Sequence, residues 1–161
     1  MLNQLLHRSP TPSSDLLTSK LYDETTFYKT FLKDLSNCHS EVIIESPFVT
    51  NRRLFELLPT LKKLKMRNVK IAIITKDPRE HDKDYFRDDA TEALANLQRL
   101  GIQVIYTDGH HRKLAILDRS LLYEGSLNIL SQNNSREIMR RIESVQLAWQ
   151  MARFVEVDRF L

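Results

Sequence analysis

The chain has 161 residues, of which 42% are hydrophobic and 28% are charged, with a formal net charge of +3. This length and composition fit one ordinary globular domain and are short for two. No apolar run approaches the roughly 20 residues that a membrane helix needs, and the first eight residues lack the order of a signal peptide. The lone Cys38 cannot form an internal disulfide and is expected to be buried. We therefore expect a cytoplasmic location and no membrane contact.

Hydrophobic periodicity predicts alternating helices and strands. Asp23 is a plausible cap for the first helix, and Pro59 is expected to kink or restart the second. Residues 1–20 are expected to be flexible or partly ordered, and residues 21–161 to form the domain. The predicted elements are, in chain order, helix 23–37, strand 41–45, a helix capped by Asn51, strand 69–75, helix 88–100, strands 102–106, 113–117, 121–124 and 136–142, and a C-terminal helix.

The order of these elements indicates the fold class. Strands alternate with helices early in the chain and cluster late. The run 41–45 is apolar in its centre and is typical of a buried strand. The sequence therefore predicts an α/β fold, in which helices flank both faces of a mixed β-sheet.

Charge is unevenly distributed along the chain. Basic side chains dominate residues 51–70, and acidic side chains dominate residues 77–92. Each run is compatible with a solvated helix face. The basic run is equally compatible with a surface that binds a phosphate backbone, in which case Arg52 and Arg53 are the candidate contacts.

The most informative stretch has the pattern H-x-K-x-x-x-x-D, formed by His111, Lys113 and Asp118. Six residues later comes G-S-x-N, which contains Ser126 and Asn128. A chance match of these six fixed residues has odds on the order of 10⁻⁶ to 10⁻⁵ at average residue frequencies. The combination therefore points to a functional site, although each residue alone would be an ordinary surface polar group.

The spacing suits a phosphate site. Residues two apart on an extended strand point the same way, so His111 and Lys113 are expected to share a face, and so are Ser126 and Asn128. Lys113 would supply positive charge, Ser126 and Asn128 would donate to phosphate oxygens, and the imidazole could attack phosphorus. The other histidines and the cysteine show no zinc-ligand spacing, and this chemistry requires no metal or cofactor.

The two patterns together resemble the signature of the phospholipase D superfamily. The resemblance implies that one motif histidine forms a phosphohistidine while a second histidine protonates the leaving oxygen. This chain has one copy of the motif, like the short members that complete their site by dimerising. The resemblance therefore implies a homodimer whose two His111 residues face each other. The order of elements over roughly residues 22–160 also resembles phospholipase D-like domains appended to bacterial helicases, which suggests a helicase or another nucleic-acid-processing protein as a partner.

The resemblance also implies roles for two acidic residues. Asp118 would serve structure and polarity near the site rather than bond making. Glu137 is the candidate acid that orients the histidine, with Glu124 as a second candidate. A surface acid paired with Arg136 or Arg140 is the alternative interpretation of Glu137.

The expected function is that of a metal-independent phosphodiesterase, a nuclease acting on DNA and, as a further candidate, RNA. A phospholipid phosphodiesterase is a second hypothesis, because the same motif cleaves phosphatidyl esters. A third is a nucleic-acid-binding module that grips phosphate without turnover. The intact pair of His111 and Lys113 argues against the third, since a binder would not need the nucleophile.

Overall fold

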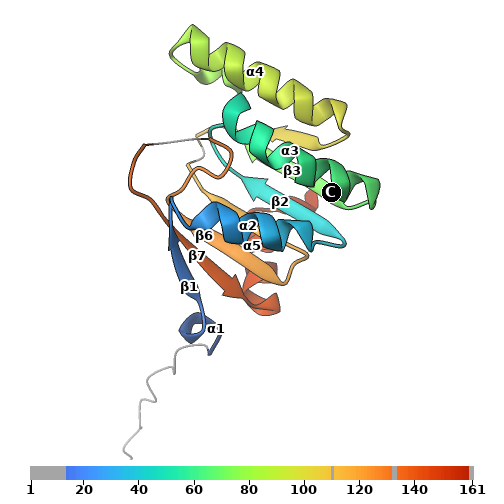
Figure 1. Cartoon of the computed structure of the whole chain (residues 1–161), viewed down its shortest axis with the longest axis vertical. Helices are drawn as coiled ribbons and strands as arrows, with labels where there is room; N and C mark the ends of the chain where they lie inside the picture. Colours follow the sequence, from blue (N-terminus) through green and yellow to red (C-terminus); the bar gives the residue numbers. More distant parts are fainter. Residues whose placement is uncertain (1–13, 110, 132–133, 160–161) are drawn as a thin grey trace, which may run out of the picture.

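The computed structural model describes residues 14–109, 111–131 and 134–159 (Figure 1). Seven strands form one sheet in the order β1-β7-β6-β5-β2-β3-β4. The strands are β1 (Lys20–Asp23), β2 (Glu41–Glu45), β3 (Lys70–Thr75), β4 (Gln103–Tyr106), β5 (Leu114–Leu117), β6 (Leu121–Gly125) and β7 (Ile138–Glu143). The helices are α1 (Ser14–Leu17), α2 (Phe27–Ser36), α3 (Asn51–Met66), α4 (Asp84–Arg99) and α5 (Val145–Phe154), with short 3-10 helices η1 (Pro78–Glu80) and η2 (Val157–Arg159).

Helices cover both faces of the sheet, which confirms the predicted α/β class. Helices α2, α3 and α4 lie on the face toward the viewer in Figure 1, and α5 lies behind the sheet. Strand side chains alternate between the two cores: Val42 and Ile44 pack beneath α2 and α3, and Ile43 packs toward α5. Cys38 is buried, as expected, and burial raises the pKa of its thiol to about 12.

Strand direction brings one set of loops together. Strands β2, β3 and β4 are parallel, whereas β5, β6, β7 and β1 each run antiparallel to the strand beside them. The last residues of β1, β2, β3, β4 and β6 therefore lie at the same edge as the first residues of β5 and β7. We call this the site edge, and the opposite one the far edge.

Several predicted boundaries were wrong. The strand β1 was not predicted, and α2 begins at Phe27, because Asp23 ends β1 and its carboxylate accepts the backbone N–H of Thr25 and Thr26. The predicted restart at Pro59 does not occur, since α3 continues through it. Thr50 caps α3 in place of Asn51, and its hydroxyl accepts the N–H of Arg53. Helix α4 starts four residues before its predicted beginning at residue 88.

Two further points concern the ends and surface of the domain. Of the N-terminal segment 1–20, which is expected to be flexible or partly ordered, residues 1–13 lie outside the described residues, residues 14–17 form α1, and Lys20 is the first residue of β1. Among the described residues, no helix is both long and apolar enough to cross a membrane.

Candidate active site

The motif residues, apart from Asp118, all lie at the site edge. His111 and Lys113 come immediately before β5, and Ser126 follows β6 directly. Asn128 lies two residues further along the same loop, and Glu137 immediately precedes β7. Because β5, β6 and β7 are consecutive antiparallel neighbours, the start of β5, the end of β6 and the start of β7 are adjacent. Residues well separated in the sequence thus share one end of the sheet.

His111 is exposed. The Lys113 ammonium donates to the backbone carbonyl of His111 at 2.6 Å. Arg112 pairs with a neighbouring strand: its Nε lies 2.8 Å from Oε1 of the buried Glu45, and its guanidinium lies over the ring of Phe154. His111 and Lys113 themselves precede the regular strand, which begins at Leu114.

Gly125 has a steric reason to be glycine. A Cβ built at this position would lie 2.2 Å from the backbone oxygen of Ile138, well inside contact distance. The next residue, Ser126, forms two hydrogen bonds with the backbone of Ile138. Its N–H donates to the Ile138 oxygen at 2.9 Å, and its hydroxyl oxygen accepts the Ile138 N–H at 3.0 Å. The hydroxyl hydrogen is therefore left to donate to a ligand.

Asn128 is held in a loop that is fixed from three sides. The Tyr28 hydroxyl donates to the Ile129 oxygen at 3.0 Å, and burial raises the pKa of this phenol to about 12, so it stays a donor. Leu130 receives the N–H of Thr50 at 2.9 Å and donates to the Ser46 hydroxyl. These bonds anchor the loop to α2 and to the segment after β2. The buried Asn128 amide is thereby positioned without using its own side-chain groups.

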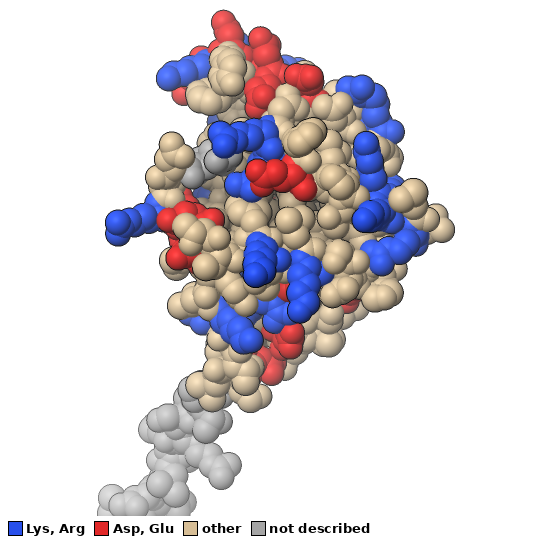
Figure 2. All heavy atoms as spheres, in the orientation of Figure 1, with Lys and Arg blue, Asp and Glu red and all other residues tan. Residues whose placement is uncertain are grey.

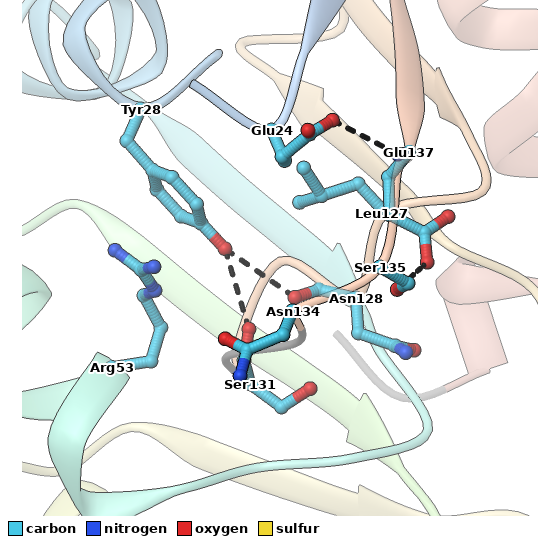
Figure 3. Close-up of a pocket in the computed structure, with 9 residues that line it drawn as sticks. All are labelled: Glu24, Tyr28, Arg53, Leu127, Asn128, Ser131, Asn134, Ser135 and Glu137. Atoms are coloured by element: carbon cyan, nitrogen blue, oxygen red, sulfur yellow. Dashed lines mark hydrogen bonds between the residues drawn. The ribbon is translucent and has the colours of Figure 1, made fainter. Parts of the chain in front are cut away.

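A polar pocket of about 330 Å³ opens beside Asn128 (Figure 3). Arg53 and Tyr28 stand on one side of it, and Glu137 and Ser135 on the other. The Arg53 guanidinium lies 3.5 Å from the centre of the Tyr28 ring and pairs with Glu56. The remaining lining residues are Glu24, Leu127, Asn128, Ser131 and Asn134.

Glu137 faces this pocket. Its Oε1 accepts the Ser135 hydroxyl at 2.6 Å, and its N–H donates to the Glu24 carboxylate at 3.0 Å (Figure 3). The second candidate, Glu124, lies opposite Arg140 in the β6–β7 register and lines different hollows, not the one that contains Asn128. The geometry therefore places Glu137, rather than Glu124, beside the motif asparagine.

Comparison with known proteins assigns the family. The family model described as "Cardiolipin synthase, PLD-like domain" matches residues 31–158, which is most of the chain. The chain belongs to the phospholipase D superfamily. A search of curated proteins found no match.

Solved structures share the phospholipase D-like fold at low sequence identity. Nuc from Salmonella typhimurium, described as a phospholipase D family member, is 15% identical, with a TM-score of 0.69 over 85% of this chain and 90% of its own. NucT from Helicobacter pylori is 18% identical, with a TM-score of 0.67 over 86% and 92%. Phosphatidylserine synthase from Haemophilus influenzae is 15% identical, with a TM-score of 0.64 over 88% and 38%. These likenesses establish the fold.

Asp118 does not lie near the other motif residues of this phospholipase D-like domain. It follows β5 at the far edge, and a four-residue strand spans about 13 Å. Its carboxylate accepts the backbone N–H groups of His39, Ser40 and Glu41, each at 2.9 Å. Burial alone would raise the pKa of Asp118, but these hydrogen bonds outweigh it and lower that pKa.

The basic run 51–70 does not form one surface beside the site. Arg52 and Arg53 occupy the first turn of α3, at the site edge, where Arg52 is exposed and Arg53 is buried in the pocket wall. Figure 2 shows a separate group of basic side chains over the C-terminal end of α3, and acidic side chains over α4. The other bases of this run are Lys62, Lys63, Lys65, Arg67 and Lys70.

Sequence reasoning missed the residues that surround Asn128. Tyr28 and Ser131 line the polar pocket, and Phe48, His81 and Phe86 line a second pocket on the other side of Asn128. They come from α2, from the β6–β7 loop, from the β2–α3 segment, from the residue after η1, and from the first turn of α4. No linear pattern connects them, and only the position of Phe48 directly after a strand end was a usable signal. Among the described residues, no cluster of His, Cys, Asp and Glu is arranged to hold a metal ion.

Proposed function

We propose that this domain is a metal-independent phosphodiesterase that cleaves nucleic acid, with His111 as its nucleophile. The observation that carries the proposal is that the residues with an exposed imidazole, an ammonium, a hydroxyl and an amide all lie at one edge of the sheet, in a chain of this superfamily. Phosphoryl transfer needs a nucleophile and donors to the non-bridging oxygens, and these groups supply both.

The reaction would occur in two displacements. A His111 nitrogen attacks phosphorus, so a P–N bond forms, the P–O bond to the leaving oxygen breaks, and a second imidazolium gives that oxygen a proton. Water then attacks phosphorus and breaks the P–N bond, while the second imidazole takes the water proton. Lys113, Ser126 and Asn128 would stabilise the charge on the phosphoryl oxygens in both steps. Glu137 would orient a histidine from its place beside Asn128.

The second histidine would come from a second copy of the chain. Exposed apolar side chains of Leu21, Ile138 and Phe154 surround a hollow of about 370 Å³ whose lining includes Lys113 and Gly125. Apolar surface next to motif residues is typical of a surface that another protein covers. A two-fold contact at the site edge would bring two His111 residues to a shared site.

The test is cleavage in excess EDTA. The full-length protein would be incubated with single-stranded DNA, double-stranded DNA and RNA, and the His111→Ala variant would be compared with His39→Ala. His39 is an exposed histidine at the far edge and serves as the matched control. We expect His39→Ala to keep the wild-type rate and the rate of His111→Ala to fall by at least about 100-fold, because removal of a nucleophile abolishes the covalent route. Loss of wild-type cleavage in EDTA, restored by magnesium, would contradict the proposal.

A phospholipid phosphodiesterase is the second candidate. The matching family model is described as a cardiolipin synthase domain, and one of the similar folds is a phosphatidylserine synthase. The same reaction on a phosphatidyl ester would use the same residues. Vesicles of phosphatidylglycerol and phosphatidylcholine in the same assay distinguish the candidates: hydrolysis of lipid without cleavage of any strand would favour the second.

A further inference from the structure

A second pocket, which we call the aromatic pocket, lies at the site edge on the other side of Asn128. Its volume is about 240 Å³, and its walls come from the β2–α3 segment, from the residues around the start of α4, and from the β6–β7 loop. The lining residues are Phe48, Val49, Thr50, His81, Phe86, Asp89, Asn128 and Ser131. The pocket thus shares Asn128 and Ser131 with the polar pocket of Figure 3.

Three rings from separate segments border this pocket. The rings of Phe48 and His81 have centroids 5.3 Å apart and planes inclined by 31°, so they touch without stacking fully on each other. Burial, assisted by Lys76, lowers the pKa of His81, so the imidazole is neutral at pH 7. Phe86, in the first turn of α4, is 49% exposed. The Lys83 ammonium lies 5.9 Å from the centroid of this ring, and the exposed part of the ring is available to a flat ligand.

Two buried polar atoms between the pockets have no hydrogen-bond partner in the part of the chain that the structure describes. Asn128 is 8% exposed and Ser131 is 5% exposed, and among the described residues neither Asn128 Oδ1 nor Ser131 Oγ has a hydrogen-bond partner. Buried polar groups are rarely left in this state, because each one loses its hydration without compensation. A ligand that enters either pocket would restore these bonds.

The chemistry of these two atoms limits the chemical classes of ligand that can satisfy them. Phosphate oxygens only accept hydrogen bonds, so a phosphate can use the Asn128 amide N–H but cannot satisfy its Oδ1. The missing partner is a group that donates a hydrogen bond through N–H or O–H, and the aromatic walls favour one that is flat and partly apolar and is attached close to the phosphate. A nucleobase has all of these properties, since its edges carry amine or ring N–H groups and its faces stack on aromatic rings.

We propose that the aromatic pocket binds the base of the nucleotide beside the phosphate that is cleaved. The base would lie against Phe86 and Phe48, and its edge would reach Asn128 and Ser131. A base stacked and paired inside a duplex cannot enter such a pocket without being extruded. The inference rests on the proposed function and extends it: the substrates are single strands, overhangs or other sites with an unpaired base.

The experiment measures binding, and uses Phe86 as the variable. All proteins carry His111→Ala so that no strand is cut. Fluorescence anisotropy would give Kd for a ten-nucleotide thymidine strand and for an abasic strand of the same length and charge. We expect Phe86→Ala to weaken binding of the thymidine strand by about 5- to 150-fold, the range reported by alanine substitution of one stacking aromatic. Binding of the abasic strand should not change.

Phe55→Ala is the matched control, because Phe55 is a more exposed phenylalanine, at 78%, and lines none of these pockets. It should leave both affinities unchanged. Thermal unfolding would verify that both variants are folded. Equal Kd values for the thymidine and abasic strands, or equal effects of Phe86→Ala and Phe55→Ala, would overturn the proposal.

Two further measurements separate this inference from the proposed function. Wild-type protein in EDTA should cleave the abasic strand slowly; failure to cut any strand would overturn the proposed function, whatever the binding results. Binding to phosphatidylglycerol vesicles that depends on Phe86, with no effect of Phe86 on strand binding, would assign the pocket to a lipid and overturn the base pocket alone.

Discussion

At the scale of single residues, the motif combines positions with different tasks. His111 and Lys113 lie at the site edge, whereas Asp118 supports the far edge of the sheet. Its carboxylate binds three successive backbone N–H groups just where the chain enters β2. Asp118 also has φ of +50°, a left-handed conformation that aspartate and asparagine tolerate better than most residues. A sequence motif therefore need not converge in space.

The first prediction concerns Asp118. Asp118→Asn keeps the side-chain shape and the tolerance for positive φ but removes the charge and points an amide N–H₂ at three N–H donors. We expect the free energy of unfolding to fall by about 1–2 kcal/mol, because the lost hydrogen bonds are charge-assisted but the carboxylate is only partly buried. Activity per folded molecule should remain near the wild-type value. Urea unfolding and the EDTA cleavage assay measure the two quantities.

The same hydrogen bonds make the free energy of unfolding depend on pH. The pKa of Asp118 is lower in the folded protein than its unfolded value of roughly 3.9. The contribution of Asp118 to the free energy of unfolding is therefore complete above the unfolded pKa and disappears as the pH falls through the folded pKa. The difference in stability between wild type and Asp118→Asn should therefore be constant near neutral pH and shrink below about pH 4. A selective loss of turnover in Asp118→Asn, with stability unchanged, would instead give Asp118 a part in catalysis.

At the scale of elements, the sequence predicted buried strands well and exposed ones poorly. The bounds 41–45 of β2 agree with the structure, because this strand is covered on both faces and is apolar throughout its centre. The strand β1 was missed because it is short and mostly exposed, so no alternation marks it. Its position comes from pairing with β7, which is a long-range interaction.

The site was predictable to a similar extent. The motif identified His111, Lys113, Ser126 and Asn128, since their spacing is fixed within one stretch of chain. The pocket walls could not be predicted, because Tyr28, Phe48 and Phe86 are brought to Asn128 only by the packing of three segments. The same packing decides that Arg53 is buried while its neighbour Arg52 is exposed.

The second prediction here concerns α3, which continues through Pro59. Proline lacks the N–H that would donate to the carbonyl four residues earlier, and its ring crowds that carbonyl. Pro59 is exposed, so a smaller side chain leaves no cavity. We expect Pro59→Ala to raise the free energy of unfolding by about 1–3 kcal/mol, measured by urea unfolding. Lys62→Ala, an exposed change one turn later, is the control and should be near neutral. A less stable Pro59→Ala would mean that α3 is shaped to fit the proline.

At the scale of the whole molecule, charged and apolar side chains are unevenly distributed over the surface, and both kinds occur near the site edge. The net charge of +3 conceals an acidic α4 and a basic C-terminal end of α3 (Figure 2). Near the site edge, Arg52 adds an exposed positive charge, while Leu21, Ile138 and Phe154 expose apolar side chains beside Lys113. A polar site bordered by apolar surface is suited to a second copy that covers the border and leaves the pockets open to a substrate.

The last prediction tests the shared site in mixed dimers. Wild-type and His111→Ala chains with different affinity tags would be mixed, and the heterodimer isolated through both tags. If each reaction needs one histidine to attack and another to protonate the leaving oxygen, the heterodimer lacks one of them at every site. Its activity should then fall by about 100-fold or more, the usual contribution of general acid–base catalysis. Two independent sites would instead leave half of the activity.

A heterodimer of wild type with His39→Ala is the control and should be fully active. Half activity, or full activity at dilutions where no dimer remains, would contradict the shared site.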